Sequence, residues 1–138
     1  MSAAVVYYSY GGTTKKLALD LASKRGAKAI EIRDVKRYTF PGTFFKGCPA
    51  AIKQRATPIV EPQADFKRFD KIILMAPVWA GFPAPAFNSI AKRLPRGMSV
   101  EVILVSTSGD SSKSRGKVTE MLEDLGLKVT GYSDIKNK

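Results

Sequence analysis

The stretch at residues 5–18, VVYYSYGGTTKKLA, joins an apolar run to a helix-like segment through two glycines and two threonines. A plain turn from a strand to a helix needs about one glycine or one capping hydroxyl, so this junction has more than the turn requires. Gly11 and Gly12 let the backbone turn tightly and leave its amide groups unshielded. The helix begins directly afterwards, and the positive end of its dipole points to the same place. The junction therefore predicts an anion site, and a phosphate monoester suits its neutral donors.

The candidate donors belong to the first loop, residues 9–14. An ordinary glycine-rich turn with Thr13 as the helix cap would explain the same residues, and the stretch alone leaves that alternative open. Two common nucleotide motifs are excluded, because GGTTKK lacks the spacer and the ending of a Walker A loop and is not a GxGxxG sequence. The expected binding residues of this loop are Ser9, Tyr10, Gly11, Gly12, Thr13 and Thr14.

Outward from this junction, apolar runs alternate with amphipathic segments. Near-continuous apolar runs at residues 3–9, 71–77 and 101–107 are typical of parallel strands that are buried on both faces. Residues 28–34 and 127–133 alternate between apolar and polar side chains, which predicts edge strands. Helical patterns lie between the strands, at residues 13–26, 85–95 and 113–126. This order predicts an α/β fold with a parallel sheet, formed as a single domain over residues 1–138.

Residues 35–68 follow neither pattern. A short helix is expected from Pro49 to about Ala56, because proline favours the first turn of a helix. The aromatic residues before it predict a long loop folded over another part of the protein: Tyr38, Phe40, Phe44 and Phe45.

Two further loops follow the buried strands, and in an open parallel sheet ligands bind beyond the carboxyl ends of the strands. The second loop holds the only tryptophan on a proline-rich segment, which predicts a stacking wall for a flat conjugated ring. Packing of that tryptophan into the core is the alternative. The third loop is small and polar and offers backbone amides to a polar ring edge, although such a composition also suits an ordinary turn. The residues are Pro77, Val78, Trp79, Ala80, Gly81 and Phe82 in the second loop and Ser108, Gly109 and Asp110 in the third.

Composition narrows the classes of function. With Cys48 as the only cysteine and no histidine, the sequence excludes Cys/His catalytic pairs and the usual zinc sites, and we expect no catalytic residue and no metal ligand. One cysteine and the absence of an apolar leader or membrane span predict a cytoplasmic protein. The 23 lysines and arginines against 12 acids give a net charge of +11, which favours anionic partners. Because the basic residues are scattered rather than clustered with aromatics, an ordinary solvated basic surface would explain them. Among anionic partners we expect an acidic protein rather than nucleic acid.

Taken in order, the three loops resemble those of the flavodoxin family. SYGGTT at residues 9–14 is similar to that family's phosphate loop, with Gly11 in place of the usual threonine. FDKIILMAPVWAGFPAP at residues 69–85 is similar to the third strand and the loop beside the flavin ring, and VILVSTSGD at residues 102–110 resembles the fourth strand and the third loop. The resemblance covers nearly the whole chain. It implies a doubly wound five-stranded parallel sheet in the order 2-1-3-4-5, with FMN at its carboxyl edge.

Two departures from the family pattern stand out. The third loop lacks the aromatic residue that covers the outer flavin face in many flavodoxins, so that face is expected to be open or to be covered by Phe82 or Tyr10. The family's last helix is also missing, which would leave part of one sheet face bare. We expect either a second copy of the chain, a homodimer, to cover this face, or its outward side chains to be polar, as Lys128, Thr130 and Tyr132 suggest.

The resemblance implies an FMN-binding protein that carries electrons between redox partners with acidic surfaces. The alternative is an FMN-dependent reductase or dehydrogenase that uses NAD(P)H and acts on a quinone, flavin or porphyrin-type substrate. A third possibility is a module that has kept the fold and lost the flavin. In the first two cases the cofactor supplies the electron chemistry and the protein supplies binding and electrostatics.

Overall fold

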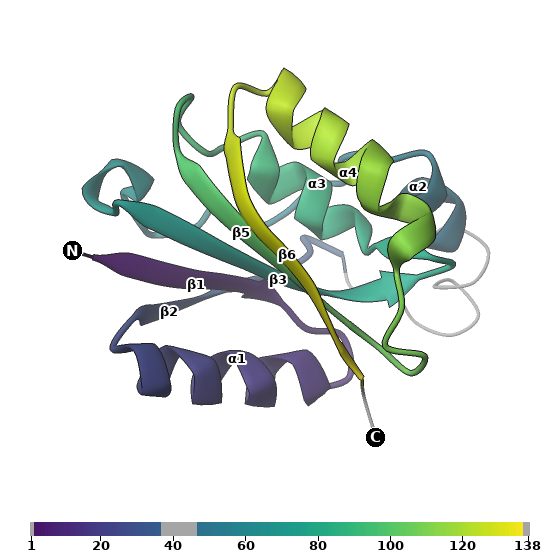
Figure 1. The fold of residues 1–138 in the computed structure, drawn as a ribbon, viewed down its shortest axis with the longest axis horizontal. Coiled ribbons are helices and arrows are strands. Elements are labelled where there is room, and N and C mark those ends of the chain that lie inside the picture. The colour runs from purple at the N-terminus through teal and green to yellow at the C-terminus, as the bar shows by residue number, and fades with distance from the viewer. Residues whose placement is uncertain (1, 37–46, 137–138) are drawn as a thin grey trace.

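The computed structural model describes residues 2–36 and 47–136 and shows a twisted sheet with helices on both faces (Figure 1). The aromatic segment predicted at residues 38–45 lies outside the described residues. The helices are α1 Thr13–Arg25, α2 Cys48–Ile52, the 3-10 turn η2 Phe66–Arg68, α3 Pro85–Ala91 and α4 Ser112–Asp124. The strands are β1 Ala3–Tyr8, β2 Lys28–Ile32, β3 Lys71–Trp79, β4 Phe82–Pro83, β5 Ser99–Ser106 and β6 Lys128–Lys136.

The strand order is β2-β1-β3-β5-β6, and every neighbouring pair along this path is parallel. Once the short strand β4, which pairs antiparallel with β3, is set aside, this is the predicted order 2-1-3-4-5. β2 and β6 lie at the two edges, as the alternation of their sequences predicts. The prediction of an α/β flavodoxin-like fold is confirmed.

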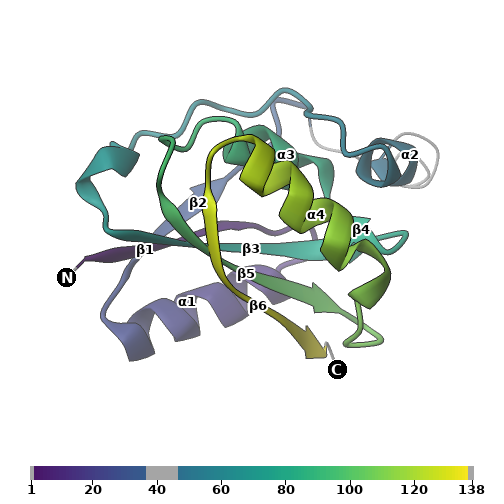
Figure 2. The ribbon, with the colours of Figure 1, turned by 45° about the horizontal axis from the view of Figure 1, so that its top comes forward.

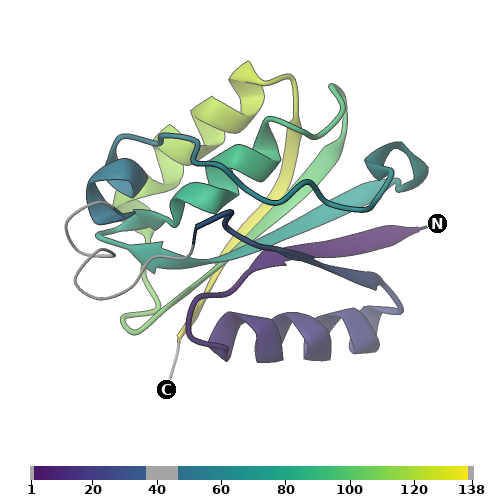
Figure 3. The same ribbon diagram turned by 180° about the vertical axis from the view of Figure 1, so that it is seen from behind.

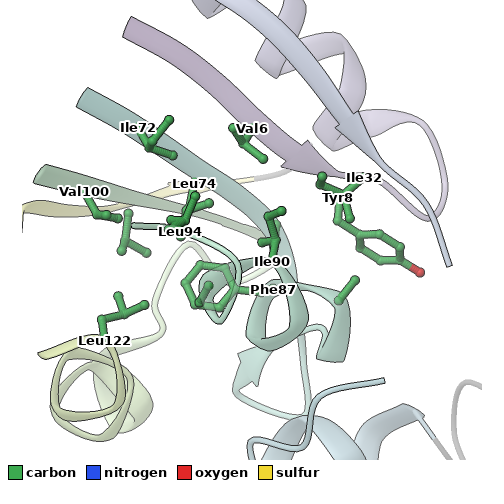
Figure 4. Close-up of a cluster of buried hydrophobic side chains, with 14 of the residues drawn as sticks. Val6, Tyr8, Ile32, Ile72, Leu74, Phe87, Ile90, Leu94, Val100 and Leu122 are labelled. Atoms are coloured by element: carbon green, nitrogen blue, oxygen red, sulfur yellow. The ribbon is translucent and has the colours of Figure 1, made fainter. Parts of the chain in front are cut away.

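Helices α3 and α4 cover one face of the sheet and α1 covers part of the other (Figures 1 and 2). The face beneath α3 and α4 holds the larger core, because every second residue of the central strands points to it. Phe87 of α3 and Leu122 of α4 are buried against Leu74 of β3 and Val102 of β5 (Figure 4 labels the first three). The close packing of these side chains fixes both helices to the sheet.

The opposite face has a smaller core beneath α1. Ala18 and Ala22 of α1 pack against Val5, Ile73 and Ile103, and the small alanine side chains let the helix approach the strands closely. Seen from behind, α1 runs beside β1 and β2 (Figure 3). Within residues 2–36 and 47–136, α1 is the only helix on this face, so the part formed by β5 and β6 is covered by side chains alone.

An ion cluster lies on that uncovered part. The Glu101 carboxylate is 2.9 Å from the Arg25 guanidinium and 2.8 Å from the Lys71 ammonium. A side chain at Gly131 of β6 would meet the Glu101 Cγ at 3.2 Å, so the missing side chain makes room for Glu101. Polar groups therefore occupy part of the bare face, beside the apolar Ile103 and Ile135, and the named residues Lys128 and Thr130 are exposed. The choice of Tyr132 as an outward residue is wrong, because its ring packs with the α3 and α4 core and under Arg115.

Several predicted boundaries need correction, including the end of β6, which lies at Lys136 rather than Ser133. Gly12, with a left-handed φ of 96°, takes the cap position of α1 that was expected for Thr13, so Thr13 is the first helical residue. The helix that follows Pro85 ends at Ala91 rather than Pro95, and the one at Pro49 ends at Ile52. β3 continues past Pro77 to Trp79 because it pairs there with β4.

No helix in the described part of the chain is both long enough and apolar enough to cross a membrane.

Candidate functional site

The three predicted loops lie at the same end of the sheet, where β1, β3 and β5 finish (Figure 1). This follows from the parallel pairing of β1 with β3 and of β3 with β5, which brings their carboxyl ends together. The sequence therefore predicted correctly which segments would meet at this edge.

The first loop forms a tight turn before α1. The Gly12 amide donates to the Ser9 Oγ at 3.1 Å, and the Gly12 carbonyl accepts the first helical bond, from the Lys16 amide. A Cβ added at Gly11 or Gly12 would meet no atom within 4 Å, so the outer side of the turn is open. Thr13 is exposed, whereas Thr14 is buried beneath the turn. The open turn thus offers backbone groups and the Thr13 hydroxyl to a ligand.

A hollow of about 810 Å³ adjoins this turn. It extends from the first loop along α1 to the end of β6, and its walls combine lysine side chains with one leucine. The residues that line it are Gly11, Gly12, Thr13, Lys16, Leu17, Asp20 and Lys136.

The charges at the start of α1 favour an anion. The first turn of the helix contains no acidic residue, although acids are the residues that stabilise this end of a helix dipole. Lys15 and Lys16 follow the two threonines instead. Lys15 lies 3.7 Å from Glu31, while Lys16 lines the hollow. A bound anion would offset both the lysine charges and the positive helix end.

The second loop is a β-hairpin. Val78 pairs with Pro83 and Trp79 with Phe82, and the turn between them consists of Ala80 and Gly81. Both turn residues have positive φ, 53° and 89°, as a two-residue turn of type I′ requires. Alanine is uncommon in this conformation, so the hairpin carries local strain. The Pro77 carbonyl accepts a hydrogen bond from the Ala84 amide and closes the base of the hairpin.

Trp79 connects the second loop to the first. Its ring meets Tyr10 edge-on at 5.6 Å between centroids and Tyr8 edge-on at 6.1 Å. A side chain at Gly47 would collide with the indole at 2.7 Å, so the indole lies against the backbone there. Trp79 is half-buried in this position, between the ligand edge and the core. Tyr8 is held beneath it by a 2.5 Å hydrogen bond from its hydroxyl to Asp34.

The third loop is a turn that is held in place by hydrogen bonds. The Gly109 amide donates to the Ser106 Oγ at 2.9 Å, and the Asp110 carboxylate accepts from the Ser112 amide at 2.9 Å. The bonds from Ser112 lower the pKa of the exposed Asp110 below its ordinary value. Gly109 has a φ of 71°, and a Cβ there would meet the Lys136 Cβ at 2.9 Å, so the turn packs closely on β6. Ser108 is exposed at its tip.

The structure thus brings the first loop and Trp79 into contact and places the third loop beside β6. Sequence reasoning missed Gly47, Lys16 and Lys136. Lys16 follows the first loop directly, so its position was a usable signal, but Gly47 and Lys136 come from distant parts of the chain. In the part of the chain that the structure describes, no three acidic, cysteine or histidine side chains gather as a metal site.

Comparison with known proteins gives a consistent result for the fold. No protein-family model matches the sequence, and no curated protein is significantly similar. Among solved structures, a flavoprotein from Lactobacillus acidophilus in complex with FMN is 26% identical, with a TM-score of 0.77 over 96% of this chain and 92% of that one. A candidate flavoprotein from Bacteroides eggerthii is 17% identical, with a TM-score of 0.84 over 99% and 89%. An oxidised flavodoxin from Bacillus cereus is 14% identical, with a TM-score of 0.54 over 100% and 87%. The chain is therefore flavodoxin-like in its fold.

Proposed function

We propose that this protein binds FMN at the first loop and carries electrons between redox partner proteins in the cytoplasm. The observation that supports this most directly is the meeting of the open, glycine-rich first loop with Trp79 at the ligand-binding edge of the sheet. The similarity to a solved flavoprotein in complex with FMN, 26% identical over 92% of that protein's length, also supports the proposal.

The donor set fits a phosphate monoester. The amides at the start of α1, the Thr13 hydroxyl and the open side of Gly11 suit a dianion, and no acidic residue stands in the first turn. Ser9 shapes the turn through its bond with the Gly12 amide, and the buried Thr14 would act through its backbone. The hairpin at Val78–Gly81 and the third loop at Ser108–Asp110 would hold the ring. Bound FMN supplies one- and two-electron chemistry, so no side chain here has to act as an acid or a base.

The charge of the protein selects its partners. A net charge of +11 attracts acidic surfaces and repels basic ones, which sets the on-rate and the specificity of a transient complex. We therefore propose partners with acidic surfaces. The single cysteine fits a reducing compartment such as the cytoplasm.

A second candidate function is an FMN-dependent reductase that uses NAD(P)H. The observation in its favour is the third loop, where Ser108 and Asp110 are exposed and no aromatic residue is present to cover the outer face of a bound ring. A small substrate could reach that face directly. Rapid oxidation of NADPH with transfer to a quinone would support this function, and slow oxidation would support the carrier.

FMN titration of the purified protein, followed by visible absorbance, tests the proposal. Gly11→Ala is the informative variant, because the added Cβ meets nothing in the protein and yet projects into the open side of the loop. We expect its melting temperature to match the parent protein and its FMN affinity to fall about tenfold or more. Gly116→Ala, on the exposed side of α4, has equal open space and is the matched control, with unchanged affinity. Equal affinity in both variants would indicate that the first loop is only a turn.

A further inference from the structure

Five basic side chains come from three elements that meet near the first and third loops: the start of α1, the end of β6 and the first half of α4. Lys16 and Lys136 line the same hollow, although they come from α1 and from the end of β6. Arg115 of α4 lies over Tyr132 of β6, with its guanidinium carbon 5.1 Å from the ring centre. The two remaining residues, Lys113 and Lys117, are one turn apart on the same helix and are exposed. These five residues form what we call the β6 basic surface.

Helix stability does not account for these positions. The first turn of α4 contains no acid and its last turn contains no base, which is the reverse of what the helix dipole favours. The acids of α4 lie at its other end, at Glu120, Glu123 and Asp124. α1 begins with the same mismatch at Lys15 and Lys16. Both helices begin at the ligand edge, so positive charge gathers there in spite of the local cost (Figure 1).

The charges of this surface are also unneutralised. Within residues 2–36 and 47–136, none of the five has a carboxylate within ion-pair distance, which is also true of exposed bases elsewhere such as Lys67 and Lys92, whereas Arg25, Lys71 and Arg93 are each held by a glutamate at 2.9 Å or less. Asp20 lines the same hollow as Lys16 and Lys136 but pairs with Lys24 at 3.0 Å, and Glu120 and Asp124 line a second hollow with Lys117. The carboxylates of the third loop and of β6 beside it bind backbone and hydroxyl groups. Asp110 accepts from the Ser112 amide, and Asp134 accepts from Ser111. The surface is therefore available to the carboxylates of another molecule.

We propose that the β6 basic surface docks an acidic protein, and that a partner in electron transfer binds here, beside the third loop. The role in electron transfer rests on the proposed FMN function, but the binding of an acidic protein does not. A nucleic acid is disfavoured because single strands are held by exposed aromatic rings, and the large exposed apolar side chains of the described residues are Leu19, Val35, Ile52 and Val60.

Binding to the FMN-free protein tests this inference without the cofactor. The probe is cytochrome b5, a soluble haem protein with an acidic face, titrated into isotope-labelled protein and followed by amide chemical shifts at 20 mM and 150 mM salt. We expect shifts centred on β6 and the first half of α4, and an affinity that falls about tenfold or more at the higher salt. Shifts spread evenly over the molecule, or an affinity independent of salt, would overturn the proposal.

The variant Lys113→Gln/Lys117→Gln removes two charges and keeps the contact of Arg115 with Tyr132. Its control, Lys67→Gln/Lys92→Gln, removes two exposed charges from η2 and from the end of α3. We expect the first pair to weaken binding about fivefold or more and the control pair to weaken it less than twofold. Equal losses would show that only net charge matters, and would overturn the assignment of the surface.

Tighter binding of a 20-nucleotide single strand than of cytochrome b5 at 150 mM salt would overturn the proposal in favour of nucleic acid. FMN affinity, measured separately, reports on the proposed function alone.

Discussion

The two faces of the sheet differ in what protects them from water. The face beneath α3 and α4 is sealed by large apolar side chains such as Phe87 and Leu122, which are almost fully buried. The face beneath α1 is sealed by alanines on one side and by the Glu101 ion cluster on the other. On the open part of the sheet, an ion cluster beside Gly131 and the apolar side chains of Ile103, Val105 and Ile135 therefore take the place of a covering helix.

The largest expected difference between the faces comes from deleting one core side chain on each. Phe87→Ala should lower the free energy of unfolding by about 4 kcal/mol, because the ring is enclosed on all sides. Ile103→Ala on the other face should cost about 2–3 kcal/mol, because Ile103 lies opposite the exposed Ser133 of β6, where solvent can enter. Urea unfolding of both variants measures these values. A loss for Ile103→Ala, the smaller deletion, that equals or exceeds the loss for Phe87→Ala would contradict the expected difference between the faces.

The second effect concerns the ion cluster. Bonds from Arg25 and then Lys71 lower the pKa of Glu101 to about 2, so its ionised form stabilises the fold above the ordinary pKa of 4.5. This contribution is lost as the pH falls from about 4.5 toward about 2. Glu101→Gln should lower the free energy of unfolding by about 1–2 kcal/mol at pH 7, which is less than the full pKa shift implies because the cluster is partly exposed. The variant's free energy of unfolding should also depend less on pH between about 4.5 and about 2.

Urea midpoints between pH 2 and pH 7 give the measurement for this variant. The control is Glu120→Gln, an exposed residue of α4. A parent protein that keeps its full stability down to pH 2 would show that the cluster does not hold the bare face.

The comparison also shows what the sequence could reveal. The apolar runs of β1, β3 and β5 indicated buried parallel strands whose following loops lie at one edge, because parallel strands buried on both faces leave a clear pattern. The order of the strands came from the resemblance to flavodoxins and not from these runs. The ion cluster left no such signal. Glu101, Arg25 and Lys71 are distant in sequence, and each has the composition of an ordinary surface residue.

Tyr132 is a second case in which the sequence pattern alone did not predict the structure. The alternating pattern of β6 placed Tyr132 on the outward side with Thr130. The register with β5 shifts between Val100 and Glu101. Because of this bulge, the side chains of the following β6 residues point to the opposite face from the one that strict alternation predicts. At the candidate site, similarly, the loop residues were predictable from their order, but the contact of Trp79 with Gly47 depends on tertiary structure.

The smallest effects concern the tyrosines of the two faces. Burial raises the pKa of Tyr132 on the α4 face to about 12, and burial also raises the pKa of Tyr7 on the α1 face. Because the unfolded chain releases the phenol proton near pH 10, the stabilising effect of Tyr132 is complete below pH 10 and is lost as the pH rises toward about 12. Tyr132→Phe should change stability by about 1 kcal/mol or less at pH 7, since the ring and its packing remain.

Tyr132→Phe should lose less stability than the parent protein as the pH rises from 10 to 12. Tyr7→Phe is the matched change on the other face. Urea midpoints at pH 9, 10 and 11 separate the two. If Tyr7→Phe flattened this range more than Tyr132→Phe, the tyrosine beneath α1 would be the better protected from water. The ranking of the two faces, which rests on the larger core under α3 and α4, would then be reversed for polar groups even though it held for apolar ones.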